Sequence, residues 1–154
     1  MRKNLPLSMM LLISAALLLP GLGFGADIPA SVGQLVTNAK KAVKTVNMAE
    51  FKAMYDKKDT GLLVDVRDPD EYASGHIPGA VNVSRGTLEF KIWSLIGGTE
   101  KPDLNTKMAL YCGSGWRCAL AAKSLKDLGF TRVTAVNMQL ADWKKAGFPF
   151  EENK

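Results

Sequence analysis

The sequence predicts an α/β fold built on a mostly parallel sheet with helices on both faces. Short segments with strand character alternate along the chain with segments whose apolar residues recur at helical spacing. The connections between these segments are short, as in chains that wind a parallel sheet. Two segments, residues 62–66 and 108–111, are nearly continuous apolar runs, which are typical of strands buried on both faces.

Residues 1–25 have the pattern of a secretory signal peptide. Arg2 and Lys3 precede a charge-free stretch, residues 4–26, whose apolar centre has the length of a signal-peptide core. Small residues around Gly25 supply a cleavage site. We therefore expect an exported, periplasmic protein with no stable membrane association after cleavage. The alternative is an uncleaved membrane anchor, because the charge-free stretch is nearly long enough to span a bilayer.

The composition is that of one domain with a mildly basic charge. The chain has 154 residues, and loss of the signal peptide would lower its formal net charge from +5 to +3. Basic residues are interspersed with acidic ones, so we expect no nucleic-acid partner. A modest positive field suits a small anionic substrate. The pattern leaves the oligomeric state open. We divide the mature chain into an N-terminal extension at 26–44, a domain at 45–150 and a C-terminal tail at 151–154.

Apolar spacing and one helix cap predict the first elements of the mature chain. The extension is expected to form a short helix within residues 31–44, followed by an edge strand at 43–46. Asn47 is a favourable N-cap, and Glu50 three residues later completes a capping box. The helix that they begin is expected to end near Asp56.

The middle of the chain is expected to add two strands and two helices. Residues 62–66 form a buried strand. An aspartate cap, an early proline and acidic residues then predict a short helix at 68–72. A short strand is expected at 80–83 and an amphipathic helix at 87–96. A loop with two glycines and a proline follows at 97–105.

The stretch around Cys112 carries the candidate chemistry. It joins the buried strand at 108–111 to a helix that continues to Leu128. The loop between them, residues 113–117, contains two glycines, so several backbone N–H groups can point at one site, where the positive end of the helix adds its field. A thiol there loses its proton more readily than in solution, and the thiolate is the nucleophile. The alternative is a buried cysteine ahead of an ordinary glycine-rich turn.

The last elements complete the alternation of strands and helices. Gly129 is the expected C-cap of the preceding helix. Residues 131–136 form a β-branched strand, and residues 140–146 form a closing helix with Trp143 as its core anchor. The chain thus ends its fold on a helix.

Three segments, taken together, resemble the signatures of the rhodanese-like domain family. They are Leu62 to Val83, Tyr111 to Arg117, and Asp142 to Pro149. The resemblance covers roughly residues 45–150 and implies a five-stranded sheet. One departure is Met138-Gln139, where the family commonly has a Gly-Gly pair. Side chains restrict the backbone angle φ, so this turn must differ, and substrate choice is open to change with it.

The resemblance also implies a role for most of the candidate residues, and Arg85 is added because it lies at the carboxyl end of the strand expected at 80–83. Cys112 is the catalytic nucleophile. The candidate substrate contacts are Gly113, Ser114, Gly115, Trp116, Arg117 and Arg85. The candidate structural supports are Asp65, Arg67, Glu71 and His76. Three alternatives stay open: carboxylates that act in catalysis, His76 as a base for Cys112, and Arg85 paired with a nearby carboxylate. His76 is the only histidine and the chain has no cysteine cluster, so we expect no metal site and no cofactor.

The length of the loop distinguishes two activities found among relatives. By resemblance, phosphatase-type members carry five residues between cysteine and arginine, whereas four separate Cys112 from Arg117 here. We therefore expect a thiosulfate sulfurtransferase, which moves sulfane sulfur to cyanide or a thiol through a Cys112 persulfide. The alternative is a non-catalytic domain that carries sulfur or binds a protein.

Cys118, the second cysteine, follows Arg117 directly. One interpretation is a small buried side chain that packs as a hydrophobe. The other is a resolving thiol that forms a disulfide with Cys112. We expect the side chain of Cys118 to point along the flank of its helix, away from Cys112. On that basis Cys118 stays reduced, and Cys118→Ser retains activity.

Overall fold

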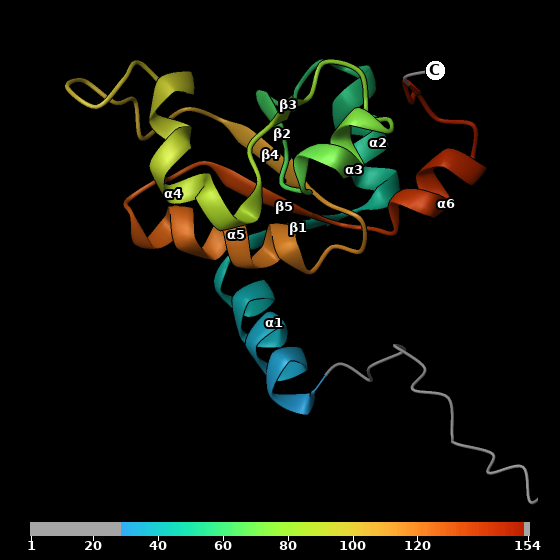
Figure 1. Ribbon diagram of the computed structural model, residues 1–154, viewed down its shortest axis with the longest axis horizontal. Helices are drawn as coiled ribbons and strands as arrows, with labels where there is room; N and C mark the ends of the chain where they lie inside the picture. Colours follow the sequence, from blue (N-terminus) through green and yellow to red (C-terminus); the bar gives the residue numbers. More distant parts are fainter. Residues whose placement is uncertain (1–28, 153–154) are drawn as a thin grey trace, which may run out of the picture.

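The computed structural model describes residues 29–152 and contains one parallel five-stranded sheet in the order β1-β5-β4-β2-β3 (Figure 1). The strands are β1 (Lys44–Asn47), β2 (Leu62–Asp65), β3 (Val81–Asn82), β4 (Met108–Tyr111) and β5 (Val133–Asn137). Every pairing of neighbouring strands is parallel. The predicted fold class is therefore confirmed, and β4, which leads to Cys112, lies at the centre of the sheet.

Helices cover both faces of the sheet, and each face has its own apolar core. The helices are α1 (Ala30–Ala42), α2 (Met48–Asp56), α3 (Pro69–Ala73), α4 (Leu88–Lys91), α5 (Arg117–Asp127) and α6 (Leu140–Lys145). On one face Ala39, Leu88 and Ala122 from α1, α4 and α5 share a core. On the other face Phe51 of α2 packs against Trp143 of α6, with ring centroids 5.0 Å apart. The sheet is thus buried on both sides.

Local sequence signals set the helix ends. In the predicted capping box, the Glu50 N–H donates to Asn47 Oδ1 at 2.9 Å, and the Asn47 N–H donates to Glu50 Oε2 at 2.7 Å. Gly129 lies just past the end of α5 with a φ of +96°, a conformation that favours glycine. These local rules placed α2 and the end of α5 correctly.

The predicted N-terminal extension forms α1, which packs against α5 and projects below the domain in Figure 1. Val36 and Ala39 are its buried residues, whereas Leu35 is exposed. The signal peptide predicted at residues 1–25 lies outside the described residues. Within residues 29–152, no helix is both long enough and apolar enough to cross a membrane.

The segment at 87–96 does not form the single amphipathic helix that its pattern predicts. It is divided into a 3₁₀ turn (Arg85–Thr87), the one-turn helix α4 and a second 3₁₀ turn (Ile92–Leu95). The Trp93 indole Nε1–H donates to the Glu89 carbonyl at 2.7 Å. This carbonyl would otherwise accept the next α-helical hydrogen bond, so the side chain competes with continuation of the helix.

Two further boundaries differ from the predicted ones. The strand expected at 80–83 pairs only over Val81–Asn82, at the edge of the sheet. Glu151, assigned to the tail, forms an antiparallel bridge with His76, with both N–H···O distances at 2.8 Å. Lys144 of α6 also pairs with Glu152 at 2.6 Å, so the contacts of the domain extend into the predicted tail. The bounds of β3 and the C-terminal end of the domain both depend on tertiary pairing, which the local sequence pattern does not show.

Candidate active site

The fold places Cys112 at the carboxyl end of the central strand. It follows Tyr111, the last residue of β4, and the helix α5 begins five residues later at Arg117. Ligands of open α/β sheets bind beyond the carboxyl ends of the strands. The Leu140 N–H at the start of α6 donates to the Gly113 carbonyl at 2.9 Å, which fixes the first turn of the loop.

The loop turns its N–H groups onto the sulfur of Cys112. The backbone N–H groups of Ser114, Gly115 and Cys118 all donate to Sγ of Cys112. The Cys118 N–H belongs to the first turn of α5, so the positive end of that helix also faces the sulfur. The predicted cradle is therefore present. Cys112 has no exposed surface, while Ser114 and Trp116 are partly exposed.

These contacts make Cys112 acidic. Its pKa falls from 9.0 to about 5, chiefly because the Cys118 side chain donates a hydrogen bond to it, with further contributions from the three backbone N–H groups. Burial acts in the opposite direction, because it disfavours the anion. Cys112 is thus a thiolate at neutral pH, which is the form that attacks electrophilic sulfur.

Gly115 is the residue on which the shape of the loop depends. Its φ is +76°, which side chains rarely adopt. A Cβ at this position would also lie 2.9 Å from Oδ1 and 3.1 Å from Cα of Asn137. Both the conformation and the close approach to the end of β5 require glycine here.

The predicted direction of the Cys118 side chain is wrong. The side chain points toward Cys112 and not along the flank of the helix. It is fully buried and forms a hydrogen bond with the Cys112 side chain, and its Sγ also lies 3.3 Å from the Val136 carbonyl oxygen, a second acceptor for the same proton. The loop is short enough that the first turn of α5 folds back over the sulfur. The two cysteines do not form a disulfide in the structure.

Arg117 is held by carboxylates of α3 rather than directed freely into the cradle. Its Nη1 lies 2.5 Å from Glu71 Oε2, its Nη2 lies 2.8 Å from Glu71 Oε1, and Asp68 lies 3.5 Å away. The hydrogen bond from Arg117 lowers the pKa of Glu71, so the pair is ionised at neutral pH. The guanidinium thus connects α5 to α3 beside the loop. Its Nη2 would lie 3.5 Å from a Cβ placed on Gly113.

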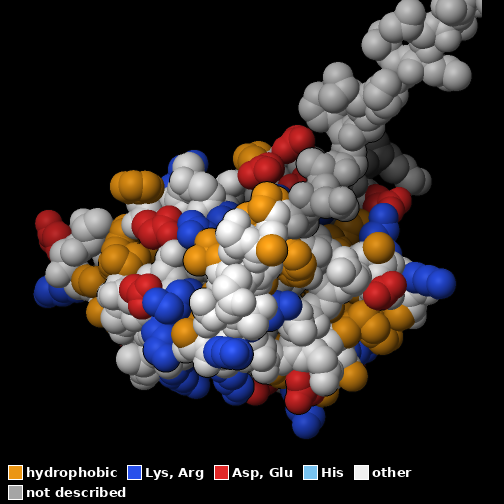
Figure 2. All heavy atoms as spheres, turned by 90° about the horizontal axis from the view of Figure 1, so that it is seen from below, with side chains coloured by type: hydrophobic (Ala, Val, Ile, Leu, Met, Phe, Trp, Pro, Cys, Tyr) orange, Lys and Arg blue, Asp and Glu red, His pale blue; other side chains and the backbone are white. Residues whose placement is uncertain are grey.

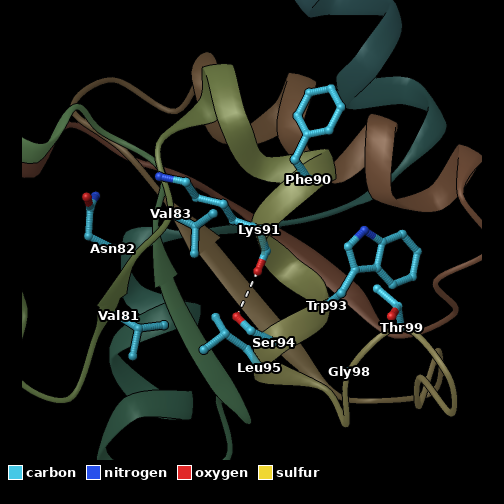
Figure 3. Close-up of a pocket in the computed structure, with 10 residues that line it drawn as sticks. All are labelled: Val81, Asn82, Val83, Phe90, Lys91, Trp93, Ser94, Leu95, Gly98 and Thr99. Carbon is cyan, nitrogen blue, oxygen red and sulfur yellow. Dashed lines mark hydrogen bonds between the residues drawn. The ribbon is translucent and has the colours of Figure 1, made fainter.

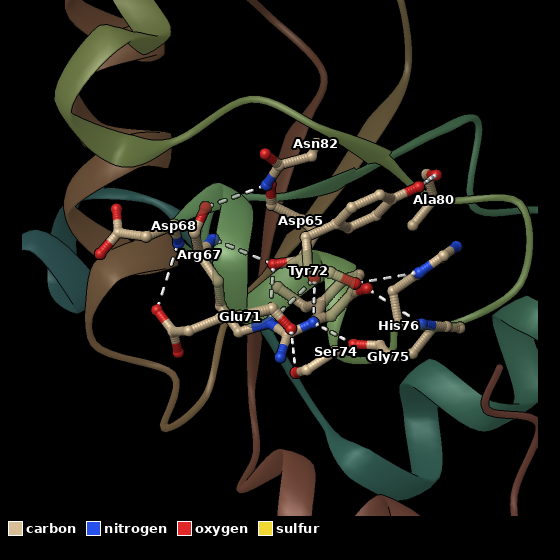
Figure 4. Close-up of polar contacts among 12 residues, drawn as sticks. Asp65, Arg67, Asp68, Glu71, Tyr72, Ser74, Gly75, His76, Ala80 and Asn82 are labelled. Carbon is tan, nitrogen blue, oxygen red and sulfur yellow. Dashed lines mark hydrogen bonds and ion pairs between the residues drawn. The ribbon is translucent and has the colours of Figure 1, made fainter. Parts of the chain in front are cut away.

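The predicted supporting residues form a network beneath the site (Figure 4). Asp65 and Arg67 are buried and paired, with Arg67 Nη2 2.6 Å from Asp65 Oδ2 and 2.7 Å from the Gly75 carbonyl. His76 stacks on Tyr72, with ring centroids 3.9 Å apart. Its Nε2 lies 3.5 Å from Glu151 rather than near the thiol. These contacts favour structural roles for Asp65, Arg67 and His76.

Arg85 is occupied by other partners. Its Nη1 pairs with Glu89 at 3.0 Å, and its Nη2 donates to Ser124 Oγ at 3.2 Å. Ser124 lies two turns along α5 from Arg117, on the part of the helix away from the cradle. The contacts match the alternative of a carboxylate pair, and an anion contact by Arg85 stays a prediction.

One hollow borders the Cys112 loop, and a larger groove does not. A groove of about 550 Å³ runs beside β3 and is lined by Phe90, Trp93 and Leu95 among others, with no residue of the Cys112 loop (Figure 3). A second hollow of about 400 Å³ is bordered by Ser114, Asn137, Met138, Gln139, Asn47, Met48 and Asp142. The Met138-Gln139 pair therefore lines the space next to the loop.

The turn at Met138-Gln139 has a backbone conformation that residues with side chains adopt freely. Neither residue has a positive φ, since Lys58 is the only non-glycine residue with one among residues 29–152. Met138 is buried and Gln139 is exposed as the N-cap of α6.

Lys and Arg side chains lie among Asp and Glu side chains on the face shown in Figure 2. Within residues 29–152, no group of His, Cys, Asp or Glu side chains is arranged to hold a metal ion.

Sequence reasoning missed two neighbours of the loop. Asn137 ends β5, packs on Gly115 and accepts a hydrogen bond from Lys40 Nζ of α1 at 2.6 Å. The position of Asn137 at a strand's carboxyl end was a usable signal. Nothing in the sequence indicates that Lys40 reaches the site, because that contact joins residues 97 positions apart.

The fold and the site together define a class: parallel α/β domains whose central strand ends in an acidic cysteine cradled by backbone N–H groups. The sequence profile of the rhodanese-like domain matches residues 47–146. The chain therefore belongs to the rhodanese-like domain family, as its motifs predict.

Curated relatives include both transfer and carrier proteins. The thiosulfate:glutathione sulfurtransferase of Saccharomyces cerevisiae is 30% identical over 115 residues, covering 68% of this chain and 81% of the yeast protein. A candidate sulfur carrier protein of Bacillus subtilis is 28% identical over 111 residues, covering 72% of this chain. The match spans 56% of that carrier's length.

Solved structures share the fold. A protein of unknown function from Rhodopseudomonas palustris, described as a possible tyrosine phosphatase, has a TM-score of 0.67 and 30% identity. That match covers 81% of this chain and 97% of the other. The polysulfide-sulfur transferase homodimer of Wolinella succinogenes has a TM-score of 0.64 and 24% identity, over 81% of this chain and 90% of that one.

The low pKa of Cys112 predicts a pH profile. The thiolate is lost as pH falls through about 5, so the rate at which iodoacetamide modifies Cys112 should halve near that pH. Between about pH 6 and 8 the rate should be nearly constant, because the thiolate fraction is then close to one. Peptide mapping of the alkylated protein measures this rate for Cys112 alone. A rate that keeps rising tenfold per pH unit up to pH ~8 would contradict the cradle geometry.

The Arg117–Glu71 pair predicts a moderate effect. Glu71→Gln keeps the side-chain shape but removes the charge that orients Arg117, so kcat/KM for thiosulfate should fall about three- to ten-fold, the pair being only half-buried. Asp70→Asn is the matched control, because Asp70 is exposed on the same helix and its substitution also removes one negative charge. Equal effects of the two substitutions would show that only net charge matters.

Proposed function

We propose that this protein is a sulfurtransferase that moves sulfane sulfur from thiosulfate, or a similar donor, to cyanide or a thiol through a persulfide on Cys112. One observation carries the proposal: the Cys118 side chain and three backbone N–H groups of the loop and the start of α5 converge on the buried sulfur of Cys112. The hydrogen bond from Cys118, followed by those from the N–H groups, lowers the pKa of Cys112 to about 5. A relative that the chain matches over most of its length is named for thiosulfate and glutathione.

In the first half-reaction, the Cys112 thiolate attacks the outer sulfur of thiosulfate. A new S–S bond forms to Cys112, the S–S bond of thiosulfate breaks, and its electron pair leaves with sulfite. The negative charge moves from Sγ to the outer persulfide sulfur. The N–H groups of Ser114, Gly115 and Cys118 favour an anion at this point before and after the transfer.

In the second half-reaction, cyanide or a thiolate attacks the outer sulfur of the persulfide. The bond between the two sulfurs breaks, thiocyanate or a new persulfide leaves, and the electron pair returns to the Cys112 thiolate. Since the enzyme alternates between two covalent states, the kinetics should be ping-pong. Neither step needs a metal or a cofactor.

Arg117 and the hollow beside the loop have supporting roles in this scheme. Because Glu71 binds both Nη atoms of Arg117, the guanidinium holds the loop closed and adds positive charge near the donor. Cys112 has no exposed surface, so the donor reaches it when the partly exposed Ser114 and Trp116 side chains move aside. The hollow bordered by Ser114 and Met138 is the nearest open space for the acceptor.

The rival function is a non-catalytic domain that carries sulfur or binds a protein, as the name of the Bacillus subtilis relative suggests for that protein. A thiosulfate:cyanide assay on the mature protein separates the two. A catalyst forms thiocyanate over many turnovers, whereas a carrier forms at most one equivalent. The four-residue loop makes phosphate monoesters poor substrates, and p-nitrophenyl phosphate serves as the negative control.

We also propose that the protein is exported to the periplasm through the signal peptide at residues 1–25. Fusion of residues 1–30 to a reporter tests this. Export of the cleaved reporter supports the proposal, retention in the membrane favours the anchor, and retention in the cytosol with an intact N-terminus contradicts both.

A further inference from the structure

The two thiols of the site lie against each other in a fully buried environment. Neither Cys112 nor Cys118 has exposed surface, and their side chains form a hydrogen bond. Each thiol carries one proton at most, so one sulfur donates and the other accepts. The surroundings decide which is which.

The backbone favours the anion on Cys112 alone. Sγ of Cys112 accepts hydrogen bonds from the N–H groups of Ser114, Gly115 and Cys118, whereas Sγ of Cys118 lies 3.3 Å from the Val136 carbonyl oxygen. A carbonyl oxygen repels a thiolate and accepts from a thiol. The proton therefore belongs on Cys118, and its hydrogen bond to the Cys112 sulfur, together with burial, raises the pKa of Cys118 well above 9.0.

We propose that Cys118 is a positioning residue whose S–H donates to the Cys112 sulfur whenever that sulfur is an anion and turns to the Val136 carbonyl when it is not. This inference rests on the proposed function and deepens it. The S–H has an acceptor in both covalent states of the cycle. When the charge moves from Sγ of Cys112 to the outer persulfide sulfur, the Cys118 S–H can donate to the Val136 carbonyl. The buried S–H therefore keeps a hydrogen-bond acceptor.

The charged groups around the pair do not replace this donor. Arg117 of α5 acts on Cys112 at a distance, but Glu71 of α3 and Asp68, the N-cap of α3, bind its guanidinium. Lys40 of α1 acts on Cys118 in the same way, and its Nζ is bonded to Asn137. Cys118 is the side chain in hydrogen-bond contact with the sulfur of Cys112.

Two substitutions separate hydrogen bonding from packing. Cys118→Ser keeps a donor of similar size, and Cys118→Ala removes the donor. The readout is the midpoint of thiolate formation at Cys112, followed by ultraviolet absorbance against matched variants that also carry Cys112→Ser. We expect the midpoint of Cys118→Ser to stay close to that of the natural protein. The midpoint of Cys118→Ala should rise by about one to two pH units, because a shift of this size corresponds to the loss of one hydrogen bond to a charged group. Cys118→Val, which fills the space without a donor, takes the place of Ala if that variant does not fold.

The outcomes are distinct from those that decide the proposed function, because the titration needs no sulfur donor or acceptor. An unchanged midpoint in Cys118→Ala, or an equal rise in the Ser and Ala variants, would overturn the proposal. So would a Cys112–Cys118 disulfide that forms with release of sulfide when the protein is treated with thiosulfate, because a thiol that stays protonated does not attack. A midpoint that rises in Cys118→Ala but not in Cys118→Ser supports the proposal that Cys118 donates to Cys112, whatever the activity assays show.

Discussion

Cys112→Ser should abolish thiosulfate:cyanide sulfurtransferase activity, with a fall in kcat of at least about a thousand-fold. Serine nearly preserves the shape of the side chain, but its hydroxyl is not ionised in the cradle and does not form a persulfide. The cradle and the fold remain, so circular dichroism and thermal unfolding should change little. The measurement is thiocyanate formation by the purified mature protein.

The matched control is Cys118→Ser, which also replaces one buried thiol by a hydroxyl. It should keep activity within a few-fold of the natural protein, because the hydroxyl can donate to the Cys112 sulfur in place of the S–H. Comparable losses in the two variants would mean that the chemistry depends on the pair of thiols and not on Cys112 as the nucleophile.

Gly115→Ala should have the second largest effect. The new methyl group meets Asn137 at 2.9 Å, and the backbone at φ +76° strains any side chain, so the loop must shift. The shift withdraws the Gly115 N–H from the Cys112 sulfur. We expect kcat/KM for thiosulfate to fall about ten- to hundred-fold, and the free energy of unfolding to fall by about 1–3 kcal/mol.

Gly113→Ala is the control for Gly115→Ala in the same loop. Gly113 does not have a positive φ, and its nearest neighbour would be Arg117 Nη2 at an ordinary contact distance of 3.5 Å. This variant should keep most of its activity and stability. Equal damage by both substitutions would show that the loop tolerates no side chain, and that the direction of the Gly115 N–H is not the cause.

The parts of the fold that depend on local chemistry could be predicted from the sequence. The capping box at Asn47, the glycine past α5 and the apolar runs of β2 and β4 each act over a few residues, and the structure contains all of them. The position of Cys112 at the carboxyl end of a strand follows from the same alternation of strands and helices, whereas the central place of that strand comes from the strand order of the folded sheet.

What could not be predicted depends on contacts between distant parts of the chain. The helix expected at 87–96 is broken where the Trp93 indole takes the Glu89 carbonyl, and the periodic pattern does not show which carbonyl a side chain will bind. The direction of the Cys118 side chain depends on how tightly the loop closes around Cys112. The direction of the Arg85 side chain depends on the approach of Ser124 from α5. Each is a tertiary contact.

Mass spectrometry of the mature protein after treatment with thiosulfate tests the central claim most directly. The account predicts one additional sulfur atom, mapped to the peptide that contains Cys112 and removed by cyanide with the appearance of thiocyanate. The Cys112→Ser variant should gain nothing under the same conditions. A protein that gains no sulfur, although its Cys112 is alkylated by iodoacetamide in the folded state, would contradict the persulfide mechanism.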